Sequence, residues 1–377
     1  MPKENLLIVA DSERNADMLY AVGTFVPDPF IWFTCKNRQF VVVSDLEFDR
    51  VRREAKHCQT LSYTRYERRH ERQNNGDFPG LSDVLQTILR ERRIRKVTVA
   101  ESFPLGLAKA LRRHKFKVRL RDGSFFPERA IKSADEIKKI SAALLMAEVG
   151  LSEGIHALRR TRIGKARRLM LNQSPLTAER LRAIIDTAIL QAGGNTTHTI
   201  VAGGRQSSDP HQRGHGELHA DEPIVIDIFP RSQRTGYYGD VTRTVVRGRA
   251  TEFTRAMYAA VSKAQDAAMA QLRDGTRGAD VHRAAEASFL ECGYKTSRRN
   301  GRMEGFFHAT GHGVGLDVHE PPRLNRRSLD TLRAGHVVTV EPGLYYPDIG
   351  GVRLEDVVLV TRKGPRNLTR FEKHLEI

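Results

Sequence analysis

The chain has 377 residues, a length that suggests two or three domains. Its composition, 40% hydrophobic and 28% charged, is typical of a folded globular protein. Its net charge is +17. It contains no apolar run near the roughly 18 residues of a membrane span, no signal-peptide pattern at its start, and three cysteines too scattered for a disulfide framework. We therefore expect a cytoplasmic protein without a membrane partner.

The first 125 residues alternate short apolar runs with helical patterns and predict a small α/β domain. Residues 31–45 predict a β-hairpin that turns at Lys36-Asn37-Arg38. Residues 96–102 and 115–123 predict two further strands, with an Ala- and Leu-rich helix at 105–113 between them.

Much of the positive charge lies in this first part of the chain, in residues 63–73, 90–96 and 111–121. A field of this sign attracts polyanions. The sequence has no zinc-finger, RNA-recognition or basic-zipper signature, however. A solvated basic surface therefore explains the charge better than a nucleic acid as primary partner.

A second domain is expected from residue 126 to residue 377. Ser133 and Glu136 form a capping-box pattern that predicts the start of a long helix at 134–160. The apolar face of this helix is predicted to comprise Ile137, Ile140, Leu144 and Leu145. Thr177 predicts the start of another helix, which ends at Gly193-Gly194.

The second domain also contains an internal repeat. Residues 223–248 and 336–364 each combine an apolar strand, a glycine-containing turn and a return strand. Helical segments precede both copies, at 177–192 in the first and at 254–273 or 279–291 in the second. The repeat predicts a pseudo-twofold domain in which a curved antiparallel sheet carries helices on its outer face.

Each copy of the repeat carries two acidic residues in equivalent places. Asp227 and Asp240 lie in the first copy, and Glu341 and Glu355 in the second. A carboxylate in an apolar strand is costly unless a cation or hydrogen bonds compensate it. A single such residue is usually a structural acid whose charge is compensated by hydrogen bonds. Here the repeat supplies two pairs of acids, and twofold packing would bring both pairs to the same axis, which favours cations shared among them. Four carboxylates and one imidazole suit two ions of Mn²⁺, Co²⁺, Fe²⁺ or Zn²⁺.

Four stretches in this domain resemble the pita-bread metallopeptidases, namely methionine aminopeptidase, aminopeptidase P and prolidase. The stretches are IDIFP…TGYYGDVTRT, HATGHGVGLDVHEPP, VTVEPGLYY and GVRLEDVVLV. Residues 1–125 resemble the creatinase-type N-terminal domain of aminopeptidase P and prolidase. The resemblance implies an α+β or α/β two-domain protein with a C-terminal pita-bread (creatinase/aminopeptidase) fold and a smaller N-terminal α/β domain. It also implies a homodimer.

The resemblance assigns roles to nine residues. It implies that the metal ligands are Asp227, Asp240, His312, Glu341 and Glu355. It implies catalytic roles for Glu341, His211 and His319, and substrate contacts for His308, His319 and Arg353. Three assignments keep alternatives. His308 would also fit a solvated loop residue, His215 and His219 share a loop with His211, and Arg353 would also fit a structural ion pair.

The activity implied by the resemblance is hydrolysis of the X-Pro bond at the N-terminus of dipeptides or short peptides, by a hydroxide that bridges two divalent metal ions, manganese above all. One alternative is a metallohydrolase of the same fold that acts on a small amide without proline. Another is an inactive pita-bread protein that binds a partner through its basic surface.

The sequence departs from the family in two respects. Ile-Phe-Pro follows Asp227, where a small residue is common, and the stretch between Asp227 and Asp240 is longer than usual. We expect this to reshape one wall of the cleft. The arginine that binds a dipeptide's free carboxylate is open among Arg323, Arg326 and Arg327, so dipeptidase and longer-peptide aminopeptidase both stay possible.

Overall fold

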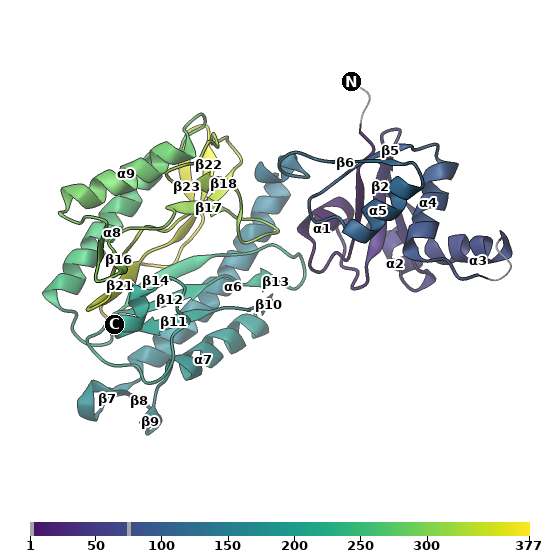
Figure 1. The fold of residues 1–377 in the computed structure, drawn as a ribbon. Coiled ribbons are helices and arrows are strands. Elements are labelled where there is room, and N and C mark those ends of the chain that lie inside the picture. Colours follow the sequence, from purple (N-terminus) through teal and green to yellow (C-terminus); the bar gives the residue numbers. More distant parts are fainter. Residues whose placement is uncertain (1–3, 74–76) are drawn as a thin grey trace. The chain divides into compact units, whose positions relative to one another are not determined.

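A computed structural model describes residues 4–73 and 77–377 of the chain. It divides into two compact units, Met1–Arg129 and Ala130–Ile377 (Figure 1). The sequence had suggested a division after residue 125, four residues earlier.

The N-terminal unit has a mixed sheet with helices packed around it. The first strands follow the order β1-β2-β3-β4, and β5 pairs in parallel with β6. The predicted hairpin is present as β2 and β3, and Lys36 and Asn37 form its turn with positive φ angles of 48° and 65°. The strands are β1 Leu7–Ala10, β2 Phe30–Cys35, β3 Arg38–Val43, β4 Cys58–Ser62, β5 Lys96–Val99 and β6 Lys117–Leu120. The helices are α1 Ala16–Val22, α2 Asp45–Glu54, α3 Tyr63–Gln73, α4 Leu81–Glu91 and α5 Leu105–Arg113.

The first half of the C-terminal unit packs two helices against an antiparallel sheet of order β11-β12-β14 (Figure 1). Its main elements are α6 Ala134–Arg159, α7 Ala178–Gln191, β11 Ile200–Gly203, β12 Ile224–Ile228 and β14 Val241–Val245. Its short strands are β7 Arg162–Ile163, β8 Leu169–Leu171, β9 Ser174–Pro175, β10 Gly194–Asn195 and β13 Arg231–Ser232.

The second half repeats this plan with α8 and α9 beside a sheet of order β18-β17-β19-β22-β23. Its helices are α8 Glu252–Ala270 and α9 Gly278–Glu291. The strands of its sheet are β17 Gly311–Gly313, β18 Glu320–Leu324, β19 Val337–Val340, β22 Asp356–Thr361 and β23 Gly364–Asn367. Two hairpins flank it, β15 Ser297–Arg299 with β16 Arg302–Glu304, and β20 Gly343–Tyr346 with β21 Gly350–Arg353.

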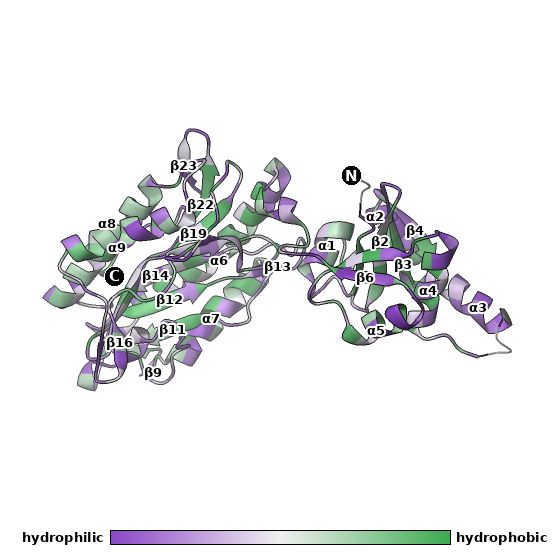
Figure 2. Ribbon diagram, turned by 45° about the horizontal axis from the view of Figure 1, so that its top comes forward, coloured by the Kyte–Doolittle hydropathy of each residue, from purple (hydrophilic) through white to green (hydrophobic). Residues whose placement is uncertain are grey.

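The long helix α6 begins at the predicted capping box. Ser133 accepts a hydrogen bond from the backbone of Glu136, whose carboxylate accepts one from the backbone of Ser133. Its apolar face was predicted correctly at Ile140 and Leu144, which are fully buried, but wrongly at Leu145, which is 59% exposed. One residue turns a helix by about 100°, so Leu145 faces solvent beside the buried stripe. In Figure 2 hydrophobic residues make up much of strands such as β12 and β22 and alternate with hydrophilic residues along the helices.

The two halves meet between β14 and β22. The backbone N–H of Glu355 donates to the carbonyl of Thr242 at 3.0 Å. Strands β14 and β22 are not otherwise paired as neighbours in one sheet. The curved sheet expected from the sequence therefore consists of two sheets that meet edge to edge. The turn predicted at Gly350 and Gly351 lies just before them, because both residues belong to β21.

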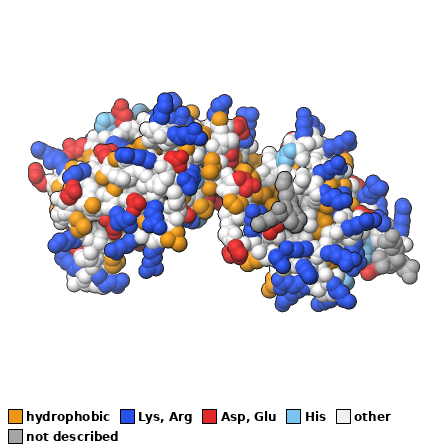
Figure 3. Space-filling model, turned by 90° about the horizontal axis from the view of Figure 1, so that it is seen from above, with side chains coloured by type: hydrophobic (Ala, Val, Ile, Leu, Met, Phe, Trp, Pro, Cys, Tyr) orange, Lys and Arg blue, Asp and Glu red, His pale blue; other side chains and the backbone are white. Residues whose placement is uncertain are grey.

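In the view of Figure 3, positive side chains are spread over the surface of both units and do not form a single patch. Over the described part of the chain, no helix combines the length and apolarity required to cross a bilayer.

Candidate metal centre and active-site cleft

One cleft of about 890 Å³ in the C-terminal unit brings together all the residues predicted for the site. They are His211, Asp227, Asp240, His308, His312, His319, Glu341, Arg353 and Glu355. The rest of the lining combines apolar residues, among them Ile200, Phe229, Phe307 and Val318, with the polar residues His198, Asp209, Arg213, Arg323 and Asn325.

Strand register places the four carboxylates. Thr242 pairs with Asp227 across β12 and β14, and Asp240, two residues before Thr242, therefore points to the same face as Asp227. In the second half, β19 pairs with β22 at Val340 and Asp356, so Glu341 and Glu355 follow directly opposite each other. The predicted pairing of acids within each repeat is thus present.

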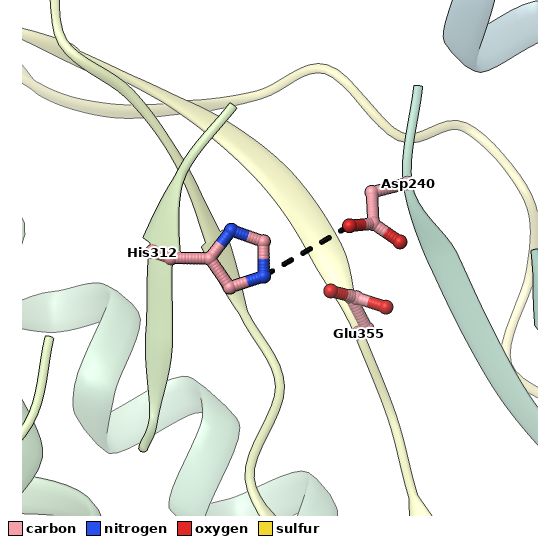
Figure 4. Close-up of side chains that lie close together, drawn as sticks. All are labelled: Asp240, His312 and Glu355. Carbon is pink, nitrogen blue, oxygen red and sulfur yellow. Dashed lines mark ion pairs between the residues drawn. The ribbon is translucent and has the colours of Figure 1, made fainter. Parts of the chain in front are cut away.

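His312 projects from β17 into this carboxylate group. Its Nδ1 donates to the carbonyl of Gly313 at 3.1 Å, so Nε2 is the nitrogen that faces the acids. Nε2 is 3.2 Å from Glu341 Oε1. It is 3.9 Å from Asp240 Oδ2, the ion pair drawn in Figure 4. Asp240, His312 and Glu355 offer ligand atoms that all lie within 4.8 Å of one another.

The electrostatics of the cluster fit a bound cation. Asp240 and Glu355 are 4% and 2% exposed. Burial, followed by the negative charge of neighbouring carboxylates, raises the pKa of both groups well above the usual range. A divalent ion among these oxygens and the imidazole would relieve the repulsion, and the donor set suits Mn²⁺ or related ions.

Arg353 belongs to the cluster through an ion pair with Asp227. From the sequence, such an ion pair had stayed open as the alternative to a substrate contact. Its Nη2 donates to Asp227 Oδ2 at 2.6 Å, and its Nη1 donates to the hydroxyl of Tyr345 at 2.9 Å. The hydroxyl of Tyr345 also lies 2.9 Å from Nε2 of His308, whose Nδ1 donates to the carbonyl of Ala309. Burial lowers the pKa of His308 to about 4, so its ring is neutral near neutral pH.

The remaining histidines differ in their position. The ring of His319 stands perpendicular to that of His312, with centroids 4.4 Å apart, and burial lowers its pKa. His211 lines the cleft, whereas its rivals His215 and His219 line a separate hollow of about 270 Å³.

Among the three arginines left open by the sequence, Arg323 lines the cleft. Arg326 and Arg327 are not part of its described lining. Arg323 also reaches the carbonyl of His319 with a hydrogen bond of 3.5 Å. Arg213, which the sequence had not singled out, lines the cleft as well.

Three supporting residues escaped the sequence analysis. Thr242 donates to Glu355 Oε2 at 2.7 Å, and Gln265 of α8 donates to the carbonyls of Val340 and Leu354, each one residue before an acid of the second repeat. Tyr345 is the third. Thr242 could have been found from the strand alternation, since it shares a face with Asp240, but nothing in the local sequence of α8 identifies Gln265.

Comparison with known proteins identifies the family. Residues 138–362 match the model of metallopeptidase family M24. The chain belongs to this family.

Relatives of this M24 protein include the Xaa-Pro dipeptidase of Pyrococcus horikoshii, 38% identical over 178 residues, which are 47% of this chain and 48% of the relative. An uncharacterized peptidase of Staphylococcus saprophyticus is 33% identical over 65% of this chain and 64% of its own length. The chain spans about half the length of the dipeptidase relatives that it matches.

Solved structures resemble the chain over nearly its whole length. The X-Pro aminopeptidase of Thermotoga maritima superposes with a TM-score of 0.82 at 22% identity, covering 99% of this chain and 97% of that one. The prolidase of P. horikoshii gives 0.79 at 25% identity, covering 99% and 95%. The predicted pita-bread fold is therefore confirmed.

The charge repulsion in the cluster generates a prediction for Asp240→Asn. A carboxyl group with a raised pKa in the folded state costs stability as the pH rises through that pKa, and removing its charge removes the cost. At pH 7–8 we expect the metal-free variant to unfold a few °C above the metal-free wild type, since about 1 kcal/mol shifts Tm by about 2–4 °C in a domain of this size. The difference should shrink toward pH 4.

Differential scanning calorimetry with and without Mn²⁺ measures this. With metal the order should reverse, because the variant lacks one oxygen ligand. A metal-free variant that is less stable than the wild type at every pH would contradict the repulsion.

Proposed function

We propose that this M24 protein is a metal-dependent peptidase that hydrolyses the X-Pro bond at the N-terminus of dipeptides or short peptides. The observation that carries the proposal is the single cleft that unites five candidate metal ligands with three further histidines and Arg353. The names of the relatives, Xaa-Pro dipeptidase and X-Pro aminopeptidase, support the choice of substrate.

The proposed metal ligands are Asp227, Asp240, His312, Glu341 and Glu355. Two divalent ions, manganese in our proposal, would polarise the scissile carbonyl and activate a water molecule when bound there. Glu341 is the proposed proton acceptor. Burial alone would raise its pKa, but its hydrogen bond with His312 and nearby positive charge lower the pKa to about 2, so the group is ionised at neutral pH.

The other polar groups of the cleft bind and orient the substrate in this proposal. His319 donates a hydrogen bond to the oxygen on which negative charge develops, and His211 faces the leaving nitrogen. His308, held neutral by burial, contacts the proline ring. Arg353 holds Asp227 in its ligand position through their ion pair.

Incubation of the purified protein with Mn²⁺ and an X-Pro dipeptide or an X-Pro-containing tripeptide tests the activity. Release of the N-terminal residue, absent after chelation and restored by Mn²⁺, is expected. A metal-loaded protein that cleaves neither class of peptide would rule out the proline assignment, and a clearly better rate on a small amide without proline would favour the alternative hydrolase.

The histidines should divide by role. His312→Ala should weaken Mn²⁺ binding, because Nε2 faces the acids. His308→Ala and His319→Ala should retain Mn²⁺ and lower kcat/KM. The loss in His319→Ala should be about 10²-fold or more, as expected for a lost hydrogen bond to the oxygen on which charge develops. Calorimetric Mn²⁺ titration separates the two effects, and equal loss of metal in all three variants would refute this division.

Arg323 provides a test of peptide length. In our proposal its guanidinium pairs with the free carboxylate of a dipeptide, as its place in the cleft allows. Arg323→Gln should raise KM for Ala-Pro by about tenfold or more, since a charged hydrogen bond contributes about 1.5–3 kcal/mol, and should affect Ala-Pro-Ala much less. Arg326→Gln serves as the matched control. If Arg323→Gln raised KM equally for both peptides, Arg323 would not bind the free carboxylate of the dipeptide.

A further inference from the structure

The strands of the C-terminal unit give the cleft two different ends. Across it they run in the order β11, β12, β14, and then β22, β19, β17, β18. The candidate ligands occupy the middle of this series, from Asp227 on β12 to His312 on β17. Arg323, the group proposed to pair with the free carboxylate that follows proline, lies on β18 at the β17–β18 end. The β11–β12 end is therefore left for the residue before the scissile bond.

At this end the cleft presents apolar side chains next to the carboxylates. Phe229 follows β12 and lies two residues beyond Asp227, so both side chains point to the same face. Because Ile228 pairs with Val241, Phe229 and Asp240 come next to each other across the ladder. Ile200 pairs with Asp227 from the other side. Both Phe229 and Ile200 line the cleft.

The backbone at Phe229 is held firmly. The neighbouring carbonyl of Pro230 accepts a hydrogen bond from the N–H of Gly239 at 3.0 Å. Gly239 packs directly on α6, where a Cβ would come within 2.3 Å of the backbone nitrogen of Leu144. The aromatic ring is thus carried by a turn that is fixed against a helix, a good basis for selective contact.

We propose that Phe229, together with Ile200, binds the side chain of the residue before proline, and that the enzyme therefore favours X-Pro substrates in which X is a larger aliphatic or aromatic residue. The inference rests on the proposed X-Pro peptidase function and adds the substrate class at its X position. Its physical basis is the removal of apolar surface from water, which for each added methylene in a fitted pocket contributes about 10-fold or more in kcat/KM.

The experiment compares kcat/KM for Ala-Pro, Leu-Pro and Phe-Pro in the wild type, Phe229→Ala and Phe229→Leu, with Mn²⁺ content measured for each protein. Phe253→Ala is the matched control, since Phe253 lies on α8, is 42% exposed and is not part of the cleft lining. We expect the wild type to prefer Leu-Pro and Phe-Pro over Ala-Pro by about tenfold or more. Phe229→Ala should lower this preference by about tenfold, and Phe229→Leu, which keeps an apolar side chain, should lower it less.

The possible outcomes distinguish a failure of the proposed role of Phe229 from a failure of the proposed X-Pro peptidase function. A wild type that cleaves X-Pro peptides, with a preference that Phe229→Ala leaves unchanged at normal Mn²⁺ content, overturns the role of Phe229. A wild type that prefers Ala-Pro, and gains Leu-Pro cleavage in Phe229→Ala, shows that the ring excludes large side chains and also overturns it. No cleavage of any X-Pro peptide overturns the proposed function, and the inference falls with it.

Discussion

Mutual repulsion among buried carboxylates is the constraint on which the C-terminal unit depends. Asp240 and Glu355 lie almost wholly out of water, close to each other and to two further acids. Without a compensating charge such a group is costly to fold, and the raised pKa values of these two residues express that cost. Arg353 offsets part of it, most directly through its ion pair with Asp227. The remaining negative charge is the reason why we propose the cluster as a cation site.

The elements behind the cluster oppose this repulsion by fixing the backbone. Gln265 ties together the residues that precede Glu341 and Glu355. Arg243, fully buried, donates to the carbonyl of Glu355 and pairs with Asp356 at 2.8 Å. Hydrogen bonds from Gln265 and Arg243 thus hold the backbone at or next to Glu341 and Glu355. This rigidity allows selective metal binding, because the ligands do not have to be assembled when the ion arrives.

Much of the site could be predicted because its residues occur in strands with a period of two and a duplicated context. Asp227 and Glu341 were identifiable as acids in apolar runs, and their partners followed from the return strands. The errors came where local pattern does not determine the environment. Leu145 is apolar yet exposed on α6, and the ladder breaks between the halves although each half has the expected strands. Gln265 acts through contacts about 75 and 89 residues away in the chain, which no local pattern encodes.

The central claim is that the five ligands hold divalent metal ions that the activity requires. The most direct measurement is a titration of the metal-stripped protein with Mn²⁺ that follows heat of binding and Leu-Pro hydrolysis together. We predict saturation at about two ions per chain, as in dinuclear hydrolases, with hydrolysis appearing as the sites fill. Full hydrolysis by the metal-stripped protein, or saturating metal that binds without producing hydrolysis, would contradict the account.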